Sequence, residues 1–374
     1  MSNHPLTVQE SVLRGDVWIR DPNIQYFNDT YYMTGTCSNA GIKIYNSTDL
    51  ENWDNGTLAY VKNDSNPWID ANFWAPEMHV REDVNGTATF YLYFSGVKDG
   101  KPRRTGCAVA SAPLGPYEDY GPMINDSGIM KVDALTPPDV NCLDGTLFYD
   151  PLSGKEYFIY SYEWINDESE TGQMWIQEMA SNYSCLLGEP VSLWRGGDAI
   201  WSNGVIDGPF VWYYNDRYYM LWSSFSSGTY TTGYASADDL LGPWEQEAWP
   251  VINTHGGHAS LFLINQSWDK IGDVSTDVNM ADLRISFHQP NSGGDPHCII
   301  AKFYYGSGRW QTDPSYTDDT WKQIQQWSIL FPYLAGVNGA LIAYGIALYL
   351  IMRKKKPDPH DWSLTHSIAF YSFK

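Results

Sequence analysis

Three aspartates occupy similar contexts along the 374-residue chain and are the first candidates for chemistry. Asp21 precedes a proline, and Asp144 and Asp207 each precede a glycine. A single aspartate in such a context is often only a turn former. Three of them in matching positions point to carboxyl groups that converge in space. Convergent carboxyl groups support general acid–base chemistry, in which one takes a proton from water and another donates a proton to a departing group.

Each aspartate opens a copy of a repeated pattern that predicts a β-hairpin. The two clearest copies turn at Asn-Asp pairs, at 28–29 and 215–216, and continue into a second strand rich in tyrosine. Looser copies begin near Trp74 and Gly257. The starting points lie near 21, 75, 144, 207 and 258, at spacings of roughly 50 to 70 residues, which is the range of a four-stranded propeller blade. The sequence therefore predicts an all-β fold, a five-bladed β-propeller.

The symmetry of a propeller predicts that the first residues of these hairpins lie at the same end of the central channel. If the register is the same in every blade, the residue that opens each first strand faces the central axis at one end of the channel. The openers are Asp21, the segment 75–77, Asp144, Asp207 and His258. Three carboxylates and a histidine are therefore expected in one pit.

Composition excludes several other classes of protein. The formal net charge is −21 and the pI is near 4.6, which argues against a nucleic-acid partner because nucleic-acid binders present basic surfaces. No Cys-x-x-Cys spacing, phosphate-cradling glycine loop or His-Glu-x-x-His occurs. Five cysteines leave one or two disulfides open but do not indicate a disulfide framework. Aromatic residues form 16% of the chain and serve either as sugar-stacking platforms or as core.

The end of the chain differs from the rest. We expect residues 1–316 to form the propeller, and residues 317–374 to form a linker, a transmembrane helix and a basic cytoplasmic tail. The segment 329–352 has 24 residues without a charge and is followed by four basic residues at 353–356. It is long enough to span a bilayer, and the basic cluster marks the cytoplasmic side. A buried soluble helix is the alternative.

Glycosylation signals favour a chain that passes through the secretory pathway. The eight Asn-x-Ser/Thr sequons begin at Asn28, Asn46, Asn55, Asn63, Asn85, Asn125, Asn182 and Asn265. With the membrane span they predict a type I protein whose propeller is extracellular. Residues 1–16 contain no apolar signal-peptide core. A truncated N-terminus, an unusual gene product and a tail-anchored protein with a cytosolic propeller are the open explanations, of which we favour truncation.

The motifs at the five openings resemble those of glycoside hydrolase family 43. They lie at 20–22, 73–78, 143–148, 206–210 and 256–258, in the family's order, and the likeness spans residues 15 to 312. The resemblance implies a five-bladed propeller that inverts configuration while it cleaves arabinose- or xylose-containing glycans. It therefore implies a carbohydrate partner, and we expect the protein to be a monomer.

The resemblance also implies roles for individual residues. Asp21 matches the family's general base, and Asp144 matches the aspartate that orients the acid and tunes its pKa. Asp207 stands where the family's general acid stands, which is usually a glutamate, one methylene longer. Trp74 matches a wall of the sugar pocket. His258 matches a histidine that helps to hold an ion in the channel, often calcium.

Inverting hydrolysis needs two carboxyl groups about 6.5 to 9.5 Å apart, so that water and sugar fit between them. Asp21 and Asp207 come from blades one and four, which are not adjacent in a ring of five. Asp144 belongs to blade three, next to blade four, where its charge can raise the pKa of the acid. A displacement of about 1 Å in a catalytic group can cost on the order of a hundredfold in rate. Because the side chain of Asp207 is one methylene shorter than that of the usual glutamate, Glu163 is the alternative acid.

Further candidates for sugar contact each have a structural alternative. Glu77 is either a hydrogen-bond partner in the site or a blade-capping residue, and Phe225 either lines the cleft or packs in the core. His288 ends the second strand of blade five and is expected to reach the same pit. His258 is either a metal ligand or a turn residue bonded to backbone.

Two rival functions stay open at this point. One is a catalytically inactive, membrane-tethered propeller that binds glycans. The other is a scaffold for protein partners, in which the axial acids would form no sugar-sized pocket. The sequence does not choose between arabinose and xylose, or between exo and endo action.

Overall fold

The computed structural model describes residues 12–98, 103–122, 141–163, 172–181, 183, 185–268, 270–274 and 278–313. The chain divides into the units Met1–Tyr316 and Thr317–Lys374, and all described residues belong to the first. The predicted span 329–352 and its basic flank lie outside the described residues, so the membrane anchor stays a prediction. Within the described ranges, no helix has the length and apolar character needed to cross a membrane.

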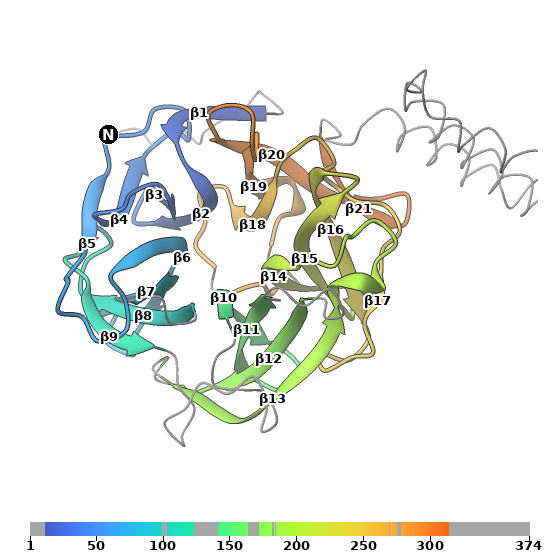
Figure 1. Ribbon diagram of the computed structural model, residues 1–374, viewed down its shortest axis with the longest axis horizontal. Helices are drawn as coiled ribbons and strands as arrows, with labels where there is room; N and C mark the ends of the chain where they lie inside the picture. Colours follow the sequence, from blue (N-terminus) through green and yellow to red (C-terminus); the bar gives the residue numbers. More distant parts are fainter. Residues whose placement is uncertain are drawn as a thin grey trace, which may run out of the picture. The chain divides into compact units, whose positions relative to one another are not determined.

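Five antiparallel sheets surround a common axis, so the predicted five-bladed propeller is confirmed (Figure 1). Blade one contains β2 (Arg20–Phe27), β3 (Thr30–Thr36), β4 (Gly41–Ser47) and β5 (Thr57–Val61). Blade two contains β6 (Ala71–Glu82), β7 (Ala88–Val97), β8 (Arg104–Ala110) and β9 (Glu118–Pro122). Blade three contains β10 (Asn141–Asp150), β11 (Lys155–Glu163), β12 (Gln173–Met179) and β13 (Leu186–Arg195), followed by the short 3-10 helix η1 (Gly196–Asp198).

Blades four and five complete the ring. Blade four contains β14 (Asp207–Tyr214), β15 (Arg217–Ser226), β16 (Thr229–Ala237) and β17 (Glu245–Gln246). Blade five contains β18 (Gly257–Leu263), β19 (Leu283–Gln289), β20 (His297–Gly306) and β21 (Arg309–Asp313), with the 3-10 helix η2 (Met280–Asp282) before β19. In every blade the first of these strands lies nearest the axis (Figure 1).

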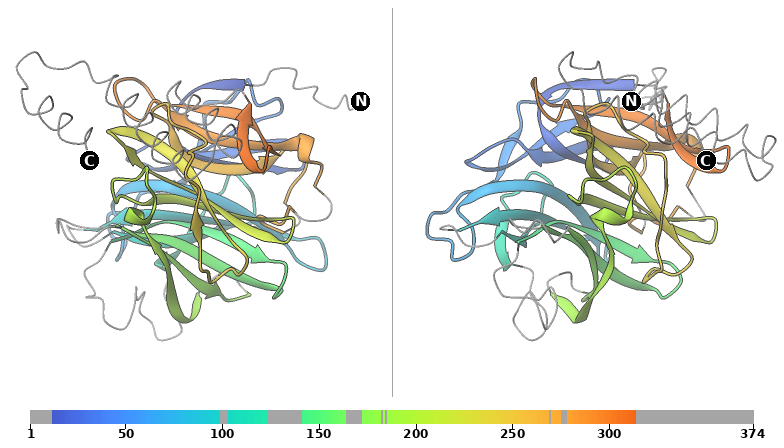
Figure 2. Two further views of the ribbon diagram at one scale, coloured as in Figure 1. Left: turned by 90° about the vertical axis from the view of Figure 1, so that its right-hand side faces the viewer. Right: turned by 45° about the vertical axis from the view of Figure 1, so that its right-hand side comes forward.

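An N-terminal strand closes the ring, and sequence reasoning missed it. β1 (Val12–Trp18) pairs with β20 of the last blade, from Val12 opposite Ala301 to Trp18 opposite His297. β21 pairs with the remaining part of β20, so both segments share one edge of that strand. Figure 2 shows the blue strand beside the orange ones. Closure joins the first blade to the last and covers an edge that would otherwise be open.

The hairpin turns form as their sequences predict. Asn28 and Asp29 have φ angles of 49° and 59°, and Asn215 and Asp216 have 51° and 60°. Two successive residues with positive φ make a two-residue turn whose twist matches that of the flanking strands. The fifth hairpin differs, because β18 ends at Leu263 and β19 begins only at Leu283. The long connection between these two strands is an insertion in the fifth hairpin.

Many of the described aromatic side chains are buried, and some of them pack between neighbouring blades. An aromatic pair bridges each of the five blade interfaces, with ring centroids 4.5–7 Å apart as favourable aromatic contacts require. The pairs are Phe27–Phe90 at 5.1 Å, Tyr93–Phe158 at 5.3 Å, Phe148–Tyr218 at 6.1 Å, Trp212–Phe303 at 5.6 Å and Tyr31–Phe262 at 6.4 Å. The aromatic content thus serves mainly as core. All five cysteines are free, so neither of the disulfides left open by the sequence forms.

Candidate active site

A β-bulge opens the innermost strand of every blade, where two residues oppose one on the next strand. The first bulge residue of each blade has a left-handed backbone, which is costly for any residue except glycine. These residues are Asp21 (φ 52°), Ala75 (φ 44°), Asp144 (φ 56°), Gly208 (φ 56°) and His258 (φ 51°). Five equivalent positions with a left-handed backbone therefore ring one mouth of the channel, and four of them carry a strained non-glycine residue.

Hydrogen bonds from the preceding blade hold these bulges in place. In four blades, the backbone N–H of the bulge residue donates to a side chain on the second strand of the blade before it. The bonds run from Asp21 to His288 Nδ1 (3.2 Å), Ala75 to Thr36 Oγ1 (2.8 Å), Asp144 to Ser95 Oγ (3.0 Å) and His258 to Ser223 Oγ (2.9 Å). In the remaining blade, Gly208 N–H donates to Asp144 Oδ2 (3.1 Å) instead. Asp144 thus belongs both to the site and to the framework that supports it.

The structure corrects the predicted register in blade four. Asp207 does not occupy the bulge position of Asp21 and Asp144; it lies one residue earlier, opposite Ser223. Gly208 takes the bulge position, and a Cβ atom there would lie 2.9 Å from the ring of His258. Glycine is therefore needed for both its backbone angle and the close approach of the histidine. Asp207 reaches the common pit from this offset position.

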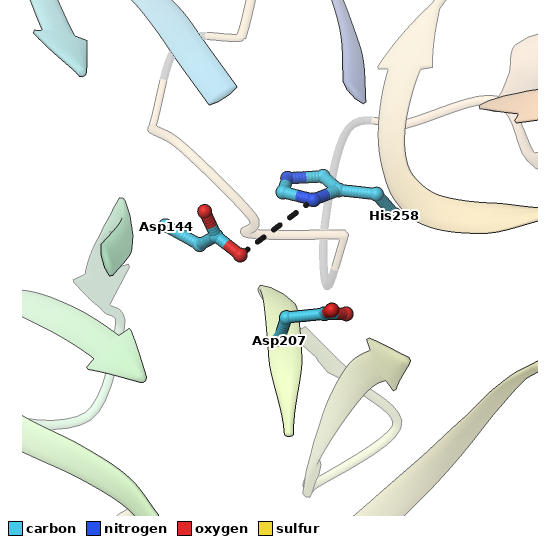
Figure 3. Close-up of side chains that lie close together, drawn as sticks. All are labelled: Asp144, Asp207 and His258. Atoms are coloured by element: carbon cyan, nitrogen blue, oxygen red, sulfur yellow. Dashed lines mark ion pairs between the residues drawn. The ribbon is translucent and has the colours of Figure 1, made fainter. Parts of the chain in front are cut away.

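The pit is a cavity of about 240 Å³ at this mouth of the channel. Six of the predicted site residues line it: Asp21, Trp74, Asp144, Asp207, Phe225 and His258. Figure 3 shows Asp144, Asp207 and His258 pointing toward one another from three different blades. Five lining residues were not predicted: Arg20, Thr36, Leu143, Tyr230 and Asn291. The expected convergence of three carboxyl groups is therefore observed.

Asp21 is held in its ionised form. Burial by itself would raise the pKa of the carboxyl, but the charge of His258 opposes it, and the pKa is lowered overall. Asp21 Oδ1 lies 3.4 Å from His258 Nδ1, and the Thr36 hydroxyl donates to Asp21 Oδ2 at 2.6 Å. Both contacts favour the carboxylate over the carboxylic acid.

The pKa values of Asp144 and Asp207 are raised, whereas that of Asp21 is lowered. Burial raises the pKa of Asp144 to about 6, against the attraction of His258. Burial and then the neighbouring charge of Asp144 raise the pKa of Asp207 to about 8. The Tyr230 hydroxyl donates to Asp207 Oδ1 at 2.6 Å and offsets part of that rise. These opposite shifts favour the ionised form of Asp21 and the protonated form of Asp207 in one cavity.

His258 lies between the acids. Its Nδ1 atom is 3.7 Å from Asp144 Oδ2, in addition to its contact with Asp21 (Figure 3). Burial would lower the pKa of His258, but the carboxyl groups around it outweigh burial and raise the pKa. The surrounding carboxyl groups therefore favour the protonated form of the imidazole.

His288 does not line the cavity, contrary to the prediction that it contacts the sugar. It is fully buried beneath Asp21, where burial lowers its pKa to about 4. Nδ1 accepts the Asp21 N–H, and Nε2 lies 3.0 Å from Asn291 Oδ1, so the neutral ring carries its proton on Nε2. The ring stacks on Tyr230 at 5.5 Å between centroids. His288 therefore positions Asp21 from below.

Glu77 does not line the cavity either, so the predicted contact of Glu77 with the sugar is not supported. It is buried, lies outside the cavity lining and brings Oε2 to 3.1 Å from His79 Nε2. The structural alternative for Glu77 is therefore the better description. The alternative acid Glu163 ends β11 opposite Asn141, and its side chain lies outside the described residues.

Trp74 forms a half-exposed wall of the cavity, with 36% of its surface accessible. The guanidinium carbon of Arg103 lies 3.6 Å from the ring centroid, a cation–π contact that fixes one face of the indole. Sequence reasoning missed Arg103. The signal that could have found it is the group of three cations within 101–104, which is unusual in so acidic a chain.

We tested whether these residues suit the predicted calcium ion. Asp144, Asp207 and His258 each offer one atom within 4.8 Å of the others. Calcium takes about six to eight oxygen ligands, whereas this set offers two carboxylates and a nitrogen. A dication there would also hold Asp207 ionised. The three residues do not fit direct calcium coordination, and a channel ion held through water stays a prediction.

Comparison with known proteins agrees with this geometry. The family model "Glycosyl hydrolases family 43" matches residues 9–305. The chain is similar to the structure of an endo-arabinase from Bacteroides thetaiotaomicron, with 28% identity, a TM-score of 0.62 and coverage of 79% of this chain and 97% of that one. A thermostable family-43 glycoside hydrolase is 24% identical, with a TM-score of 0.64 and coverage of 82% and 96%. An endo-1,4-beta-xylanase from Bacteroides thetaiotaomicron is 20% identical, with a TM-score of 0.58 and coverage of 79% and 94%.

The last two likenesses show the fold alone. Five blades with acids gathered at one channel mouth nevertheless define a class, the propeller hydrolases of glycans. The family match includes strands of all five blades, and the chain belongs to glycosyl hydrolases family 43. The resemblance inferred from the motifs is thereby confirmed, and the protein is a glycoside hydrolase.

Proposed function

We propose that the protein is an inverting glycosidase in which Asp21 is the general base and Asp207 the general acid. The observation that carries this proposal is that Asp21 and Asp207 line one cavity with different partners. Asp21 contacts His258 and Thr36, and its pKa is lowered, whereas burial and the charge of Asp144 raise the pKa of Asp207 to about 8. Two titratable groups with opposite shifts are the signature of a base and an acid. Asp144 is a positioning residue whose charge helps to keep Asp207 protonated.

The reaction follows from these protonation states. Asp21 takes a proton from water, whose oxygen attacks the anomeric carbon. Asp207 gives its proton to the glycosidic oxygen as the bond to that oxygen breaks. One proton thus enters Asp21 and one leaves Asp207, and exchange with solvent restores both groups. His258 balances the negative charge that Asp207 acquires.

For the substrate we propose an arabinose- or xylose-containing oligosaccharide or polysaccharide, and an activity of the α-L-arabinofuranosidase or β-xylosidase type. Similarity to an endo-arabinase at 28% identity supports a pentose substrate. The cavity of about 240 Å³ is slightly smaller than a typical site for a drug-sized ligand, which suits a single pentose unit. Trp74 offers that unit an apolar face for stacking.

The test is hydrolysis of arabino- and xylo-oligosaccharides, with the anomeric configuration of the first product followed by NMR. We expect turnover with inversion. Retention of configuration would overturn the proposed roles, because it requires a covalent intermediate and carboxyl groups only about 5 to 5.5 Å apart. Binding of the sugars without any turnover would instead support the inactive glycan-binding propeller.

Replacement of Tyr230 by phenylalanine should move the alkaline limb of the pH–rate profile to higher pH. The hydroxyl donates to the Asp207 carboxyl and so stabilises its ionised form; without it, the pKa of Asp207 rises further and the acid stays protonated to higher pH. We expect a shift of roughly half a pH unit to one unit. Tyr234→Phe is the matched control, because Tyr234 lies on the same strand and bonds to Glu247 instead. An unmoved limb in Tyr230→Phe would show that the hydroxyl is not coupled to the acid.

A further inference from the structure

A second cavity of about 550 Å³ lies at the opposite mouth of the channel, and we call it the far-mouth cavity. The active-site cavity is lined by the beginnings of the innermost strands. The far-mouth cavity is lined by their ends, including Phe27 of β2, the segment 80–82 of β6 and the segment 147–149 of β10. The insertion of the fifth hairpin, residues 264–282, supplies a further part of the wall with Ser267, Trp268 and the segment 270–271.

Backbone hydrogen bonds hold that insertion against blades three and four. Ile271 O accepts the Tyr149 N–H at 3.1 Å, Gly272 O accepts the Tyr213 N–H at 2.8 Å, and Val274 N–H donates to Tyr213 O at 3.0 Å. A Cβ atom on Gly272 would lie 2.4 Å from Val211 O, so only glycine allows this approach. Backbone hydrogen bonds and close packing therefore fix this wall of the far-mouth cavity against the blades.

The charges around the far-mouth cavity are balanced. Arg81 and Lys270 contribute two cations, and Glu82 and Glu156 contribute two carboxyl groups. A site for phosphate or another strong anion would carry an excess of cations. A balanced set of hydrogen-bond donors and acceptors instead suits a neutral ligand that is rich in hydroxyl groups.

Aromatic rings lie among these charged groups. The Arg81 guanidinium carbon is 5.0 Å from the centroid of the Tyr183 ring, and the Lys270 ammonium is 4.5 Å from that of Tyr149. Each cation is thereby held at the cavity wall by a cation–π contact. Apolar ring surface next to fixed polar groups matches the alternating C–H and O–H surface of a sugar.

Trp268 adds further ring surface to the far-mouth cavity. Its side chain lines the cavity and is 9% exposed. Its indole nitrogen is fully buried, so a ligand in the cavity meets only the carbon part of the ring.

We propose that the far-mouth cavity is a second, non-catalytic binding site for a segment of a neutral pentose-containing glycan. The proposal rests on the proposed function, since it takes the ligand from the same class as the substrate. The far-mouth cavity has more than twice the volume of the active-site cavity, about 550 against 240 Å³, and so has room for more than one sugar unit. It holds the enzyme on its polymeric substrate while the other mouth performs hydrolysis.

The test is calorimetric titration of the full chain carrying Asp21→Asn, which prevents turnover, with arabino- and xylo-oligosaccharides. Two sites per chain are expected. Trp268→Phe reduces the ring surface that lines the far-mouth cavity, and Lys270→Ala removes the cation from an exposed position. We expect each change to weaken the second site by about fivefold to tenfold. The unfolding temperature of each variant checks that it folds.

Matched controls separate this site from general effects. Trp310→Phe makes the same change at a buried tryptophan that does not line the far-mouth cavity, and Lys302→Gln removes an exposed cation elsewhere. Both should retain two sites. A single site in the Asp21→Asn protein would overturn the proposal, as would two sites unaffected by Trp268→Phe and Lys270→Ala. Failure of the proposed function would show separately, as absence of pentoside turnover by the wild-type chain.

Discussion

Replacement of Asp21 by asparagine is expected to lower kcat on arabinofuranosides and xylosides by roughly 10³- to 10⁴-fold, because an amide cannot take a proton from the attacking water. The fold should survive the change. Asp21 has a φ of 52°, and asparagine is one of the few residues that adopt this left-handed conformation readily. The amide oxygen can also still accept the Thr36 hydroxyl that now lies 2.6 Å from Asp21 Oδ2.

Steady-state kinetics with nitrophenyl pentosides and the unfolding temperature would be measured together. Asp29→Asn is a matched control, because Asp29 has a φ of 59° and lies in an exposed hairpin turn outside the cavity. It should leave both quantities near their wild-type values. An Asp21→Asn enzyme that retained more than a tenth of the wild-type kcat would exclude Asp21 as the base.

Replacement of Asp207 by asparagine should have an effect that depends on the leaving group. For a disaccharide, whose departing alkoxide needs a proton, we expect kcat to fall by roughly 10² to 10⁴-fold. For a dinitrophenyl glycoside, the departing phenolate is stable without protonation, and the loss should be below about tenfold. A series of aryl glycosides of increasing leaving-group pKa would give the slope of log kcat against that pKa.

The pH profile provides a second measurement on the same variant. The pKa of Asp207 is about 8, so the wild-type rate should fall as the pH rises through about 8 and the acid loses its proton. That alkaline limb should be absent from Asp207→Asn. At the other end, the lowered pKa of Asp21 keeps the base ionised down to acidic pH.

Glu163→Gln tests the alternative acid. We expect the kcat of this variant to stay within about threefold of the wild-type value on both kinds of substrate. A residue that takes no part in proton transfer does not contribute to the dependence of kcat on the leaving group. If Glu163→Gln instead showed the dependence on leaving group and Asp207→Asn did not, Glu163 would be the acid. Equal losses on all leaving groups in Asp207→Asn would indicate a role in binding rather than in proton donation.

Much of the fold could be predicted because its signals are local. Asn-Asp turns between apolar runs specify hairpins, and their recurrence specifies blades. The N-terminal strand could not be predicted in this way, because β1 becomes a strand only through its partner β20, nearly 300 residues away. Its residues carry no repeat of the hairpin pattern.

The site was predictable only where blades are equivalent. Asp21, Asp144 and His258 share the bulge position, so finding one locates the others. The offset of Asp207 depends on which residues pair across β14 and β15, and that register is set by packing. Tyr230 and His288 enter from other strands, and their contact with the acids exists only after neighbouring blades pack together.

The sequence by itself determined that a ring of blades brings aspartates to one channel mouth, because turn chemistry and repeat spacing are encoded within short stretches of chain. Only the tertiary structure decided which protonation state the surroundings of each aspartate favour. Asp144 and Asp207 each stand before a glycine, yet the pKa of Asp144 is raised to about 6 and that of Asp207 to about 8. The pKa of Asp21 is instead lowered. Burial and neighbouring charges set these values, and the neighbours come from different blades.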